Sequence, residues 1–201
     1  MRGASVLLAS SNRGKLEEFR QLAAGSGLTL DLLPGFAQIP AFPEDADTIA
    51  ENSAGKALYY SRAVQGWVMA DDSGLMVPAL GGEPGVRSSR YAGPEGDAAK
   101  NIAKLLAALG GKKDADRQAR FVCVLALARN GRVEAVFSDA VSGSILEMPH
   151  GTGGFGYDPV FYYEAAGRTF AELPREEKNR ISHRGRAFAK LAAYLQDRAP
   201  G

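Results

Sequence analysis

The sequence predicts an α/β protein in which a mixed central sheet is flanked by helices. In the first half of the chain, short apolar runs that are typical of strands alternate with stretches of helical periodicity. In the middle, Asn130-Gly131 separates two apolar runs, and this dipeptide is a strong signal for a β-hairpin. The 201 residues suffice for one large domain or two small lobes around a sizeable core.

Runs rich in aliphatic and aromatic residues are expected to form the strands. The run Trp67–Ala70 is expected to end at the polar stretch DDSG that follows it. The return strand of the hairpin is expected to be short and to be followed by a separate strand. The expected strands are Ser5–Ser10, Leu28–Leu33, Trp67–Ala70, Arg120–Arg129, Val133–Phe137, Ser142–Met148 and Tyr157–Tyr163.

Apolar residues that recur every three to four positions predict the helices. One helix is expected to begin at Asp47 or Thr48, because Thr48 and Glu51 have the spacing of a capping box. The segments 34–44 and 81–96, rich in proline or glycine, are expected to be loops. The expected helices are Gly14–Ala24, Thr48–Val64, Ala98–Leu109 and Arg184–Arg198.

The composition argues against several broad classes of protein. The formal net charge is +1, so no overall field would gather nucleic acid or an acidic membrane. The single cysteine, Cys123, excludes an internal disulfide and a cysteine-cluster metal site, and its apolar neighbours indicate a buried strand residue. No apolar run reaches the roughly 18 residues of a membrane span. We therefore expect a cytoplasmic enzyme or binding protein without nucleic-acid or membrane partners.

The segment GTGGFG, Gly151–Gly156, has the spacing of the dinucleotide-binding fingerprint. That site requires a helix after the glycines, but Pro159 biases Asp158 away from the helical conformation and the following VFYY favours a strand. We therefore reject this cofactor site. The glycines are expected either to form a flexible loop or to let backbone approach a flat ligand closely.

The segment SSNRGK is a polar turn between an expected strand and an expected helix. It is not a Walker A motif, because Ala9 replaces the first glycine and Leu16 replaces the metal-binding Ser or Thr. Free backbone N–H groups at the positive end of a helix nevertheless favour phosphate. Lys15 is unfavourable for the helix dipole unless phosphate binds beside it; the alternative is a solvated lysine. The candidate phosphate-binding residues are Ser10, Ser11, Asn12, Arg13, Gly14 and Lys15.

Carboxylates gather at two places. Asp71 and Asp72 follow a short apolar strand, and adjacent strand residues face opposite ways, so the two are expected to have different roles. Such carboxylates are the ligands that Mg²⁺ selects, and a turn cap is the alternative. The acidic residues Glu44, Asp45 and Asp47 precede a helix, where carboxylates are ordinary capping residues.

Basic residues mark two further candidate positions. Lys56 lies about two turns into the helix that begins near Thr48, close to the same face. Lys178, His183 and Arg184 lie close together near the expected start of the last helix. A histidine followed by arginine at a helix start, with a lysine shortly upstream, favours recognition of an anion or a base over a purely structural role.

In their order along the chain, these motifs resemble the inosine/xanthosine triphosphate pyrophosphatase family. The motifs are SSNRGK, TIAENSAGKA, ADDSGLMVPALGGEPGVRSSRYAG, GTGGFGYDPVF and ELPREEKNRISHRG. The resemblance covers nearly the whole chain, from Leu7 to about Leu195. The chain departs from the family pattern where Ala46 replaces a glycine and where Asp45 and Asp47 add carboxylates. Ser11 also stands where glycine is common.

The resemblance implies a single domain, residues 1–201, with two lobes and an active-site cleft between them. It implies a homodimer that hydrolyses the non-standard purine nucleotides ITP, dITP and XTP to monophosphate and pyrophosphate. Water would attack the α-phosphorus, and deaminated purines would thereby leave the nucleotide pool.

The family pattern also implies roles for residues at the matching positions. It assigns Lys15 and Lys56 to the phosphate tail. It assigns Glu44 and Asp72 to Mg²⁺, with Mn²⁺ as another candidate metal and Asp71 as a supporting carboxylate. Asp72 also takes the position of the proton acceptor.

For the base, the resemblance leads us to expect hydrogen-bond donors that face the 6-oxo group, which inosine and xanthosine have and adenine lacks. The expected donors are Lys178, His183 and Arg184. The expected walls around the purine are Phe155, Gly156 and Tyr157, with Asp158 near position 2. Ser73 is expected to touch the sugar or phosphate, and Arg90 to reach the site from its loop.

Three other function classes are weighed against this one. A sister pyrophosphatase would act on pyrimidine or modified nucleotides. A non-catalytic nucleotide-binding protein would not need the metal carboxylates Asp71 and Asp72. A nucleic-acid binder is disfavoured by the near-zero net charge and the lack of interleaved aromatic and basic residues.

Overall fold

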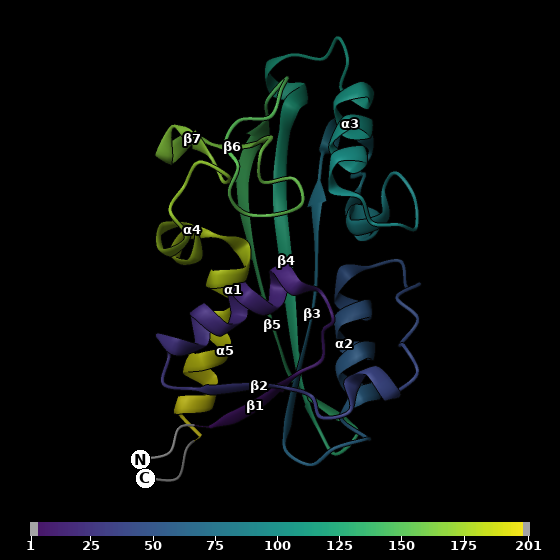
Figure 1. The fold of residues 1–201 in the computed structure, drawn as a ribbon, viewed down its shortest axis with the longest axis vertical. Helices are drawn as coiled ribbons and strands as arrows, with labels where there is room; N and C mark the ends of the chain where they lie inside the picture. Colours follow the sequence, from purple (N-terminus) through teal and green to yellow (C-terminus); the bar gives the residue numbers. More distant parts are fainter. Residues whose placement is uncertain (1–3, 199–201) are drawn as a thin grey trace. The chain divides into compact units, whose positions relative to one another are not determined.

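The computed structural model describes residues 4–198, and within them it contains a seven-stranded mixed sheet with five α-helices (Figure 1). The strands are β1 (Ser5–Leu8), β2 (Thr29–Leu32), β3 (Trp67–Met76), β4 (Gln118–Arg129), β5 (Arg132–Ile145), β6 (Phe161–Tyr163) and β7 (Arg168–Thr169). The helices are α1 (Arg13–Ala24), α2 (Ile49–Tyr60), α3 (Ala98–Ala108), α4 (Arg175–Ile181) and α5 (His183–Gln196).

The sheet order is β2-β1-β3-β4-β5-β6-β7. β1 is parallel to β2 and β3, whereas β6 is antiparallel to β5 and β7. The expected mixed α/β fold is therefore confirmed. Within residues 4–198, none of the helices has the length and apolar character needed to cross a membrane.

The chain divides into two compact units. Unit 1 comprises Met1–Asp72, Cys123–Asp139 and Arg184–Gly201, and unit 2 comprises Ser73–Val122 and Ala140–His183. The boundaries fall within β3, β4 and β5, so each of these strands contributes to both units. Each unit has its own hydrophobic core.

In unit 1, the sheet is buried on both faces. Met69 of β3 packs in a core with Phe19 of α1 and Phe188 of α5. Its neighbour Ala70 packs instead in a core with Tyr60 of α2. Because successive strand residues face opposite ways, α1 and α5 cover one face of this part of the sheet and α2 covers the other. Burial on both faces explains why these strands read as nearly continuous apolar runs.

The core of unit 2 is rich in aromatic side chains. Phe121 of β4 lies against Phe161 of β6, with ring centroids 4.6 Å apart, and Phe161 lies 4.9 Å from Phe170. Leu105 of α3 is completely buried in the same core. This core supports the segment between β5 and β6, which contains several of the candidate site residues.

Buried Arg117 joins α3 to the end of β5 within unit 2. Its guanidinium donates to the carbonyl oxygens of Leu109, Ile145 and Leu146 at 3.1, 2.6 and 2.8 Å. Leu109 is the C-cap of α3, so the cation also lies at the negative end of that helix. The contact anchors the start of the segment that leads to β6.

Two local predictions are confirmed. Asn130 and Gly131 both have positive φ, 53° and 73°, which a two-residue hairpin of the primed type requires, and they connect β4 to β5. Thr48 caps α2: the Glu51 N–H donates to Thr48 Oγ1 at 3.1 Å, and Thr48 Oγ1 donates to Glu51 Oε2 at 2.8 Å. The helix nevertheless ends at Tyr60, earlier than expected.

The prediction that a strand ends before DDSG was wrong. β3 continues through Asp71 and Asp72 to Met76, and both carboxylates are buried. Hydrophobicity alone would end the strand at Ala70, because an isolated buried carboxylate is costly. The strand continues because cations from other segments lie beside these carboxylates, as described below.

The expected break within β5 is also absent, since one strand runs from Arg132 to Ile145. The early part of β5 alternates half-buried and exposed residues, so polar side chains do not interrupt it. In contrast, only Phe161–Tyr163 of the expected strand Tyr157–Tyr163 is extended. Turn hydrogen bonds precede it, among them that from the Val160 N–H to Tyr157 O at 3.0 Å. The sequence also missed the short elements α4 and β7.

Candidate functional site

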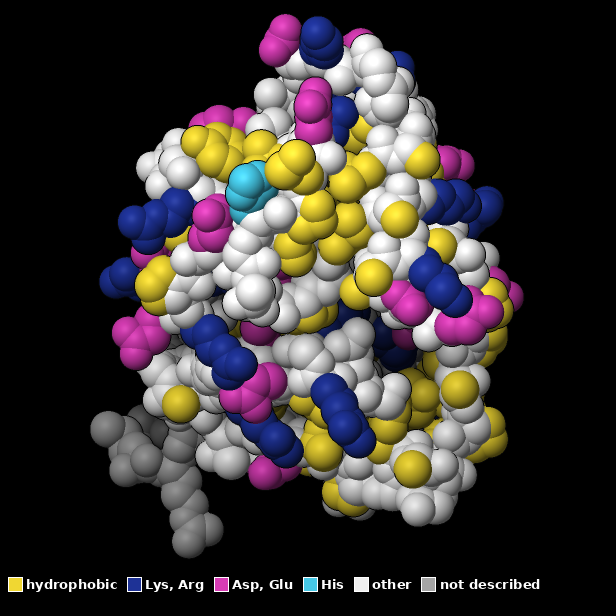
Figure 2. Space-filling view, turned by 45° about the horizontal axis from the view of Figure 1, so that its top comes forward, with side chains coloured by type: hydrophobic (Ala, Val, Ile, Leu, Met, Phe, Trp, Pro, Cys, Tyr) yellow, Lys and Arg dark blue, Asp and Glu magenta, His cyan; other side chains and the backbone are white. Residues whose placement is uncertain are grey.

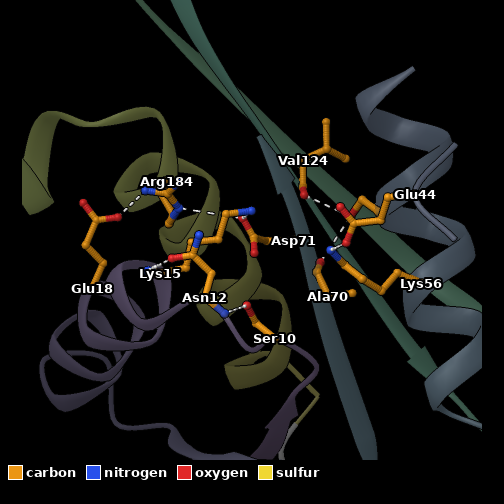
Figure 3. Close-up of polar contacts among 11 residues, drawn as sticks. Ser10, Asn12, Lys15, Glu18, Glu44, Lys56, Ala70, Asp71, Val124 and Arg184 are labelled. Atoms are coloured by element: carbon orange, nitrogen blue, oxygen red, sulfur yellow. Dashed lines mark hydrogen bonds and ion pairs between the residues drawn. The ribbon is translucent and has the colours of Figure 1, made fainter. Parts of the chain in front are cut away.

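In unit 1, Lys15 and Asp71 form an ion pair between α1 and β3 (Figure 3). Lys15 Nζ lies 2.9 Å from Asp71 Oδ2, and the side chains are 15% and 0% exposed. Lys15 is therefore not a solvated lysine. The carboxylate offsets the unfavourable position of this lysine in the first turn of α1, a role that we had expected of a bound phosphate.

The turn before α1 is organised by side chains. Asn12 is the N-cap, and its Oδ1 accepts a hydrogen bond from the Lys15 N–H at 3.1 Å. Ser10 Oγ accepts from the Asn12 N–H at 3.3 Å. The first helical hydrogen bond runs from the Leu16 N–H to Asn12 O, so the N–H groups of residues 13 and 14 precede the helical ladder. These N–H groups are in position to donate hydrogen bonds to a bound anion.

Arg184 extends the ion pair into a buried network. Its guanidinium pairs with Glu18 of α1, and its Nε lies 3.8 Å from Asp71 Oδ2. Arg184 and Glu18 are 3% and 8% exposed. Figure 3 shows the resulting order Lys15, Asp71, Arg184, Glu18. Glu18 was not among the residues expected at the site, although it lies three residues after Lys15 and so shares a helix face with it.

The neighbouring carboxyls Asp71 and Asp72 differ in their ionisation. Burial by itself would raise the pKa of Asp71, but the positive charges of Lys15 and Arg184 more than offset this effect, and the pKa lies below its ordinary value. Burial raises the pKa of Asp72, and Lys15 and Lys56 offset this only in part. The charges of Asp71 and Glu44 raise the pKa of Asp72 further. Asp71 is thus held as an anion, whereas the surroundings of Asp72 favour its neutral form relative to an ordinary carboxyl.

On the α2 side of unit 1, Lys56 Nζ lies 2.6 Å from Glu44 Oε1 (Figure 3). Lys56 is buried and Glu44 is half-buried, whereas Asp45 and Asp47 are exposed. Ser53, on the same helix, donates to the carbonyl oxygens of Ala70 in β3 and Val124 in β4, at 3.1 and 2.9 Å. This hydroxyl fixes α2 against the strand that carries Asp71 and Asp72.

The carboxylates of unit 1 have the donor chemistry that Mg²⁺ prefers. Glu44 and Asp72 are near enough for the charge of Glu44 to affect the pKa of Asp72. Among residues 4–198, no three His, Cys, Asp or Glu side chains form a ready-made metal site. Mg²⁺ is commonly bound by one or two carboxylates together with water and substrate phosphates, and Glu44 and Asp72 fit that pattern.

In unit 2, Asp158 and Lys178 form a second buried ion pair. Lys178 Nζ lies 2.6 Å from Asp158 Oδ2, and the side chains are 6% and 4% exposed. Asp158 Oδ2 also accepts a hydrogen bond from the Phe155 N–H at 2.7 Å. The ammonium lies 5.2 Å from the ring centroid of Phe155 and 5.9 Å from that of Phe170. One carboxylate therefore fixes both the lysine and the backbone of the Phe155 turn.

His183 lies at the end of unit 2 and is buried. Its ring stacks on that of Phe121, with centroids 4.7 Å apart and planes 8° apart. Phe121 is also nearly parallel to Phe170 at 5.9 Å. Phe121 was not among the expected site residues, because in the sequence it is an ordinary apolar residue within a strand pattern. Only the folded chain reveals that it orients the imidazole.

Tyr157 and Phe155 have different environments. Tyr157 is buried, and its hydroxyl donates to Ser88 O at 2.9 Å. Burial also raises the pKa of Tyr157. Phe155 is only half-buried. Of the two aromatic residues that were expected to enclose a flat ligand, Phe155 has the more accessible ring.

Contacts within the chain account for most glycines of GTGGFG. A Cβ at Gly151 or Gly153 would lie 2.7–2.8 Å from the backbone of Ala171, and one at Gly154 would lie 2.0 Å from Asp158 Oδ2. These glycines allow backbone and a buried carboxylate to approach closely, rather than a ligand. Gly156 differs, because it has φ +63° and no atom lies within 4 Å of its Cβ position.

On the face drawn in Figure 2, lysines and arginines stand beside aspartates and glutamates at several places, and hydrophobic side chains gather in its upper central part. This distribution agrees with the formal net charge of +1. The cations that could meet an anionic ligand are therefore those of local clusters, such as the one around Asp71.

A model of the Ham1 family matches residues 6–194. The chain belongs to the Ham1 family.

Individual Ham1-family relatives resemble the chain over almost their whole length. A dITP/XTP pyrophosphatase of Geobacillus kaustophilus is 50% identical over 186 residues, covering 92% of this chain and 91% of the relative. A dITP/XTP pyrophosphatase of Thermus thermophilus is 47% identical over 202 residues, covering 100% and 96%. The structure of a HAM1 protein from Coxiella burnetii superimposes with a TM-score of 0.86 at 40% identity, covering 96% of this chain and 99% of that one.

The residues that sequence patterns singled out in this Ham1-family chain fall into two groups. Those in unit 1 are Ser10, Ser11, Asn12, Arg13, Gly14, Lys15, Glu44, Lys56, Asp71, Asp72 and Arg184, and those in unit 2 are Ser73, Arg90, Phe155, Gly156, Tyr157, Asp158, Lys178 and His183. Five of these residues lie close together in unit 1, as their ion pairs and their effects on the pKa values of the two aspartates indicate. They are Lys15, Lys56, Asp71, Asp72 and Arg184. By contrast, Ser11 and Arg13 are exposed, and Ser73 and Arg90 are half-buried.

Proposed function

We propose that this protein hydrolyses the non-standard purine nucleoside triphosphates dITP, XTP and ITP to the nucleoside monophosphate and pyrophosphate. The observation that carries the proposal is the match to relatives named dITP/XTP pyrophosphatase at 50% and 47% identity over at least 92% of the chain. The sister pyrophosphatase that acts on pyrimidine or modified nucleotides is not favoured by these relatives. The charged network of unit 1 and the Asp158–Lys178 pair of unit 2 support the same chemistry.

We assign the triphosphate tail to cations of unit 1. The substrate carries about four negative charges, which a chain with a net charge of +1 must meet locally. Lys15 and Lys56 provide ammonium groups, and the backbone N–H groups at the start of α1 provide hydrogen-bond donors. Together these groups stabilise charge on the phosphates and hold them in position, which accounts for most of the catalysis in phosphoryl transfer.

We assign Mg²⁺ to Glu44 and Asp72, with Mn²⁺ as another metal that such oxygen ligands accept. When bound, the metal would neutralise phosphate charge and lower the pKa of a nearby water. Asp72 is the proton acceptor in this scheme, because it stands at the position to which the family pattern gives that role. Asp71 remains ionised and holds Lys15 in place. Water then attacks the α-phosphorus and pyrophosphate leaves.

We assign recognition of the base to residues near Phe155. Lys178 and His183 are the donors for a 6-oxo group, and Arg184 follows His183 directly. With adenine, which has a 6-amino group, buried donors would be left unmatched, and such a mismatch discriminates by ~10⁴ or more. Phe155 is the ring that we expect to stack on the purine. Tyr157 instead supports the turn from within the core.

We further propose that the protein is cytoplasmic and forms homodimers, as the family resemblance implies.

The experiment that tests the proposed function identifies the substrates and the products of the reaction. Purified protein is assayed with Mg²⁺ on dITP, ITP, XTP, GTP, ATP, dUTP and CTP, and the products are identified by chromatography. We expect pyrophosphate as the first product and rates on dITP, ITP and XTP well above those on ATP. Orthophosphate as the first product would exclude attack at the α-phosphorus, and equal rates on ATP and ITP would exclude selection by the 6-oxo group.

A further inference from the structure

Lys56 forms an ion pair with Glu44, the carboxylate that we assign to the metal. Its ammonium lies 2.6 Å from Glu44 Oε1, and the Lys56 side chain is only 8% exposed, whereas that of Glu44 is 35% exposed. Burial of a lysine is costly unless an anion lies beside it, so the free protein favours this pair. A cation at Glu44 must therefore share the carboxylate with Lys56 or displace it.

The segment that carries Glu44 is held against α2 on both sides of that residue. The Phe42 N–H donates to Tyr60 Oη at 3.2 Å, the Ala46 N–H donates to Asn52 Oδ1 at 3.1 Å, and a Cβ at Gly55 would lie 2.6 Å from the Phe42 ring. The backbone at Glu44 cannot retreat without breaking these contacts. The flexible four-carbon side chain of Lys56 is the partner that can move.

The charges around this pair are nearly balanced without any ligand. The cluster contains three cations and four carboxylates, so its formal charge is −1. The cations are Lys15, Lys56 and Arg184, and the carboxylates are Glu18, Glu44, Asp71 and Asp72. A divalent metal alone would make the cluster positive and repel the ammonium of Lys56. A triphosphate, with about four negative charges, can accept Lys56 and leave Glu44 to the metal.

We propose that Lys56 couples metal binding to nucleotide binding by exchanging Glu44 for the triphosphate. This inference rests on the proposed function, since it takes Glu44 as a metal ligand. In the free protein, the ammonium of Lys56 lies beside Glu44 in place of a metal ion, so divalent metals bind weakly. When the nucleotide attracts Lys56, the carboxylate becomes available. Coupling of this kind is reciprocal, so metal and nucleotide each strengthen the binding of the other by the same factor.

The test measures Mn²⁺ affinity in the absence of nucleotide, by EPR titration of free Mn²⁺ with metal-free protein. Lys56→Met should strengthen Mn²⁺ binding by about tenfold, the size of a typical coupling. Lys56→Arg keeps the charge and should bind Mn²⁺ as weakly as the natural protein. Lys190→Met is the matched control: Lys190 is also a paired lysine of unit 1, 2.7 Å from Asp139, but its side chain is 53% exposed. It should change the affinity by less than about twofold, because exposed charges are screened.

The double variant Glu44→Gln with Lys56→Met locates the effect. It should lose the tenfold gain, because the carboxylate that Lys56 releases is no longer present. An unchanged or weaker Mn²⁺ affinity in Lys56→Met would overturn the coupling, as would a gain that persists in the double variant. A failure of the proposed function is separate: it would appear as absent turnover of dITP by the natural protein, which the nucleotide-free titration does not measure. Thermal melts of each variant confirm that it is folded.

Discussion

Asp71 and Asp72 are consecutive residues of one buried strand, yet the fold shifts the pKa values of their carboxyls in opposite directions. Asp71 lies 2.9 Å from Lys15 and also faces Arg184, which favours its charged form. For Asp72, burial outweighs the nearby cations, which favours its neutral form. The same substitution at the two positions should therefore have opposite consequences for stability.

Asp71→Asn should lower the free energy of unfolding by about 3 kcal/mol, because it leaves buried cations without their shared carboxylate. Lys15 is 15% exposed and Arg184 only 4%, so water can solvate neither group fully. Urea denaturation followed by circular dichroism measures the change. Asp31→Asn, at an exposed position of β2, is the control and should stay within about 0.5 kcal/mol of the natural protein. Equal effects at the two positions would contradict the structural role of Asp71.

Asp72→Asn should leave the free energy of unfolding unchanged or raise it, because the neutral amide suits the environment that disfavours the charged carboxyl. Release of pyrophosphate from dITP should nevertheless fall by a factor of about 10² to 10⁴, the usual contribution of a general base. Steady-state assays and urea denaturation on the same preparation separate the two effects. Substantial retained turnover would remove Asp72 from the proposed mechanism.

The two carboxyls should also give opposite pH dependence of stability in metal-free protein. Asp71 has a lowered pKa, so its stabilising charge is fully present above the ordinary pKa of 3.8 and is lost as the pH falls through the lower folded value. Asp72 has a raised pKa, so its neutral form stabilises the fold at low pH, and this is lost as the pH rises through the folded value. The stability advantage of Asp72→Asn over the natural protein should thus grow with rising pH. A ¹³C titration of the aspartate carboxyls that gave both midpoints on the same side of 3.8 would contradict this assignment.

Lys178→Met should reduce the preference for dITP over dATP by about 10²-fold or more, because it removes a donor that we assign to the 6-oxo group. It should also destabilise the fold, since the buried charge of Asp158 would lose the cation that lies 2.6 Å from it. The double variant Asp158→Asn with Lys178→Met removes both charges and should recover part of the stability without the base preference. A preference that survives in both variants would show that another residue selects the base.

Gly74→Ala should destabilise the protein by about 1–3 kcal/mol through overpacking. A Cβ at this position would lie 2.3 Å from the carbonyl oxygen of Gly85, a backbone atom of unit 2 that cannot move freely. Gly25→Ala is the matched control, because φ at Gly25 is −89° and its nearest atom, Leu22 O, would be 4.0 Å from the new Cβ. Thermal melts of the two variants compare them, and equal shifts would argue against a close approach at Gly74.

Local patterns predicted those parts of the fold that depend on neighbouring residues. The capping box of α2 and the Asn130-Gly131 hairpin are examples, because a short stretch of chain contains all the atoms involved. The extent of β3 was not predictable in this way. Asp71 and Asp72 resemble the polar end of a strand, and only cations from distant segments allow the strand to continue through them.

The candidate site shows the same division. Sequence patterns singled out Lys15, Asp71, Asp158 and Lys178 but did not predict which of them pair. Ion pairs form between segments that only the fold brings together. Likewise, the glycines of GTGGFG were expected either to form a flexible loop or to give room for a ligand. Most of that room is taken by the backbone of Ala171 and the carboxylate of Asp158, which no local pattern reveals.

The sequence by itself determined the chemistry that is available: the mixed α/β class, the kinds of charged side chain and the Ham1-family pattern that matches residues 6–194. The tertiary structure alone decided how those side chains are paired, which carboxyl holds its charge and which ring is accessible. The physical reason is that pKa and burial depend on distances to groups far away along the chain. Asp71 and Asp72 are identical in residue type and differ only in what the fold places beside them.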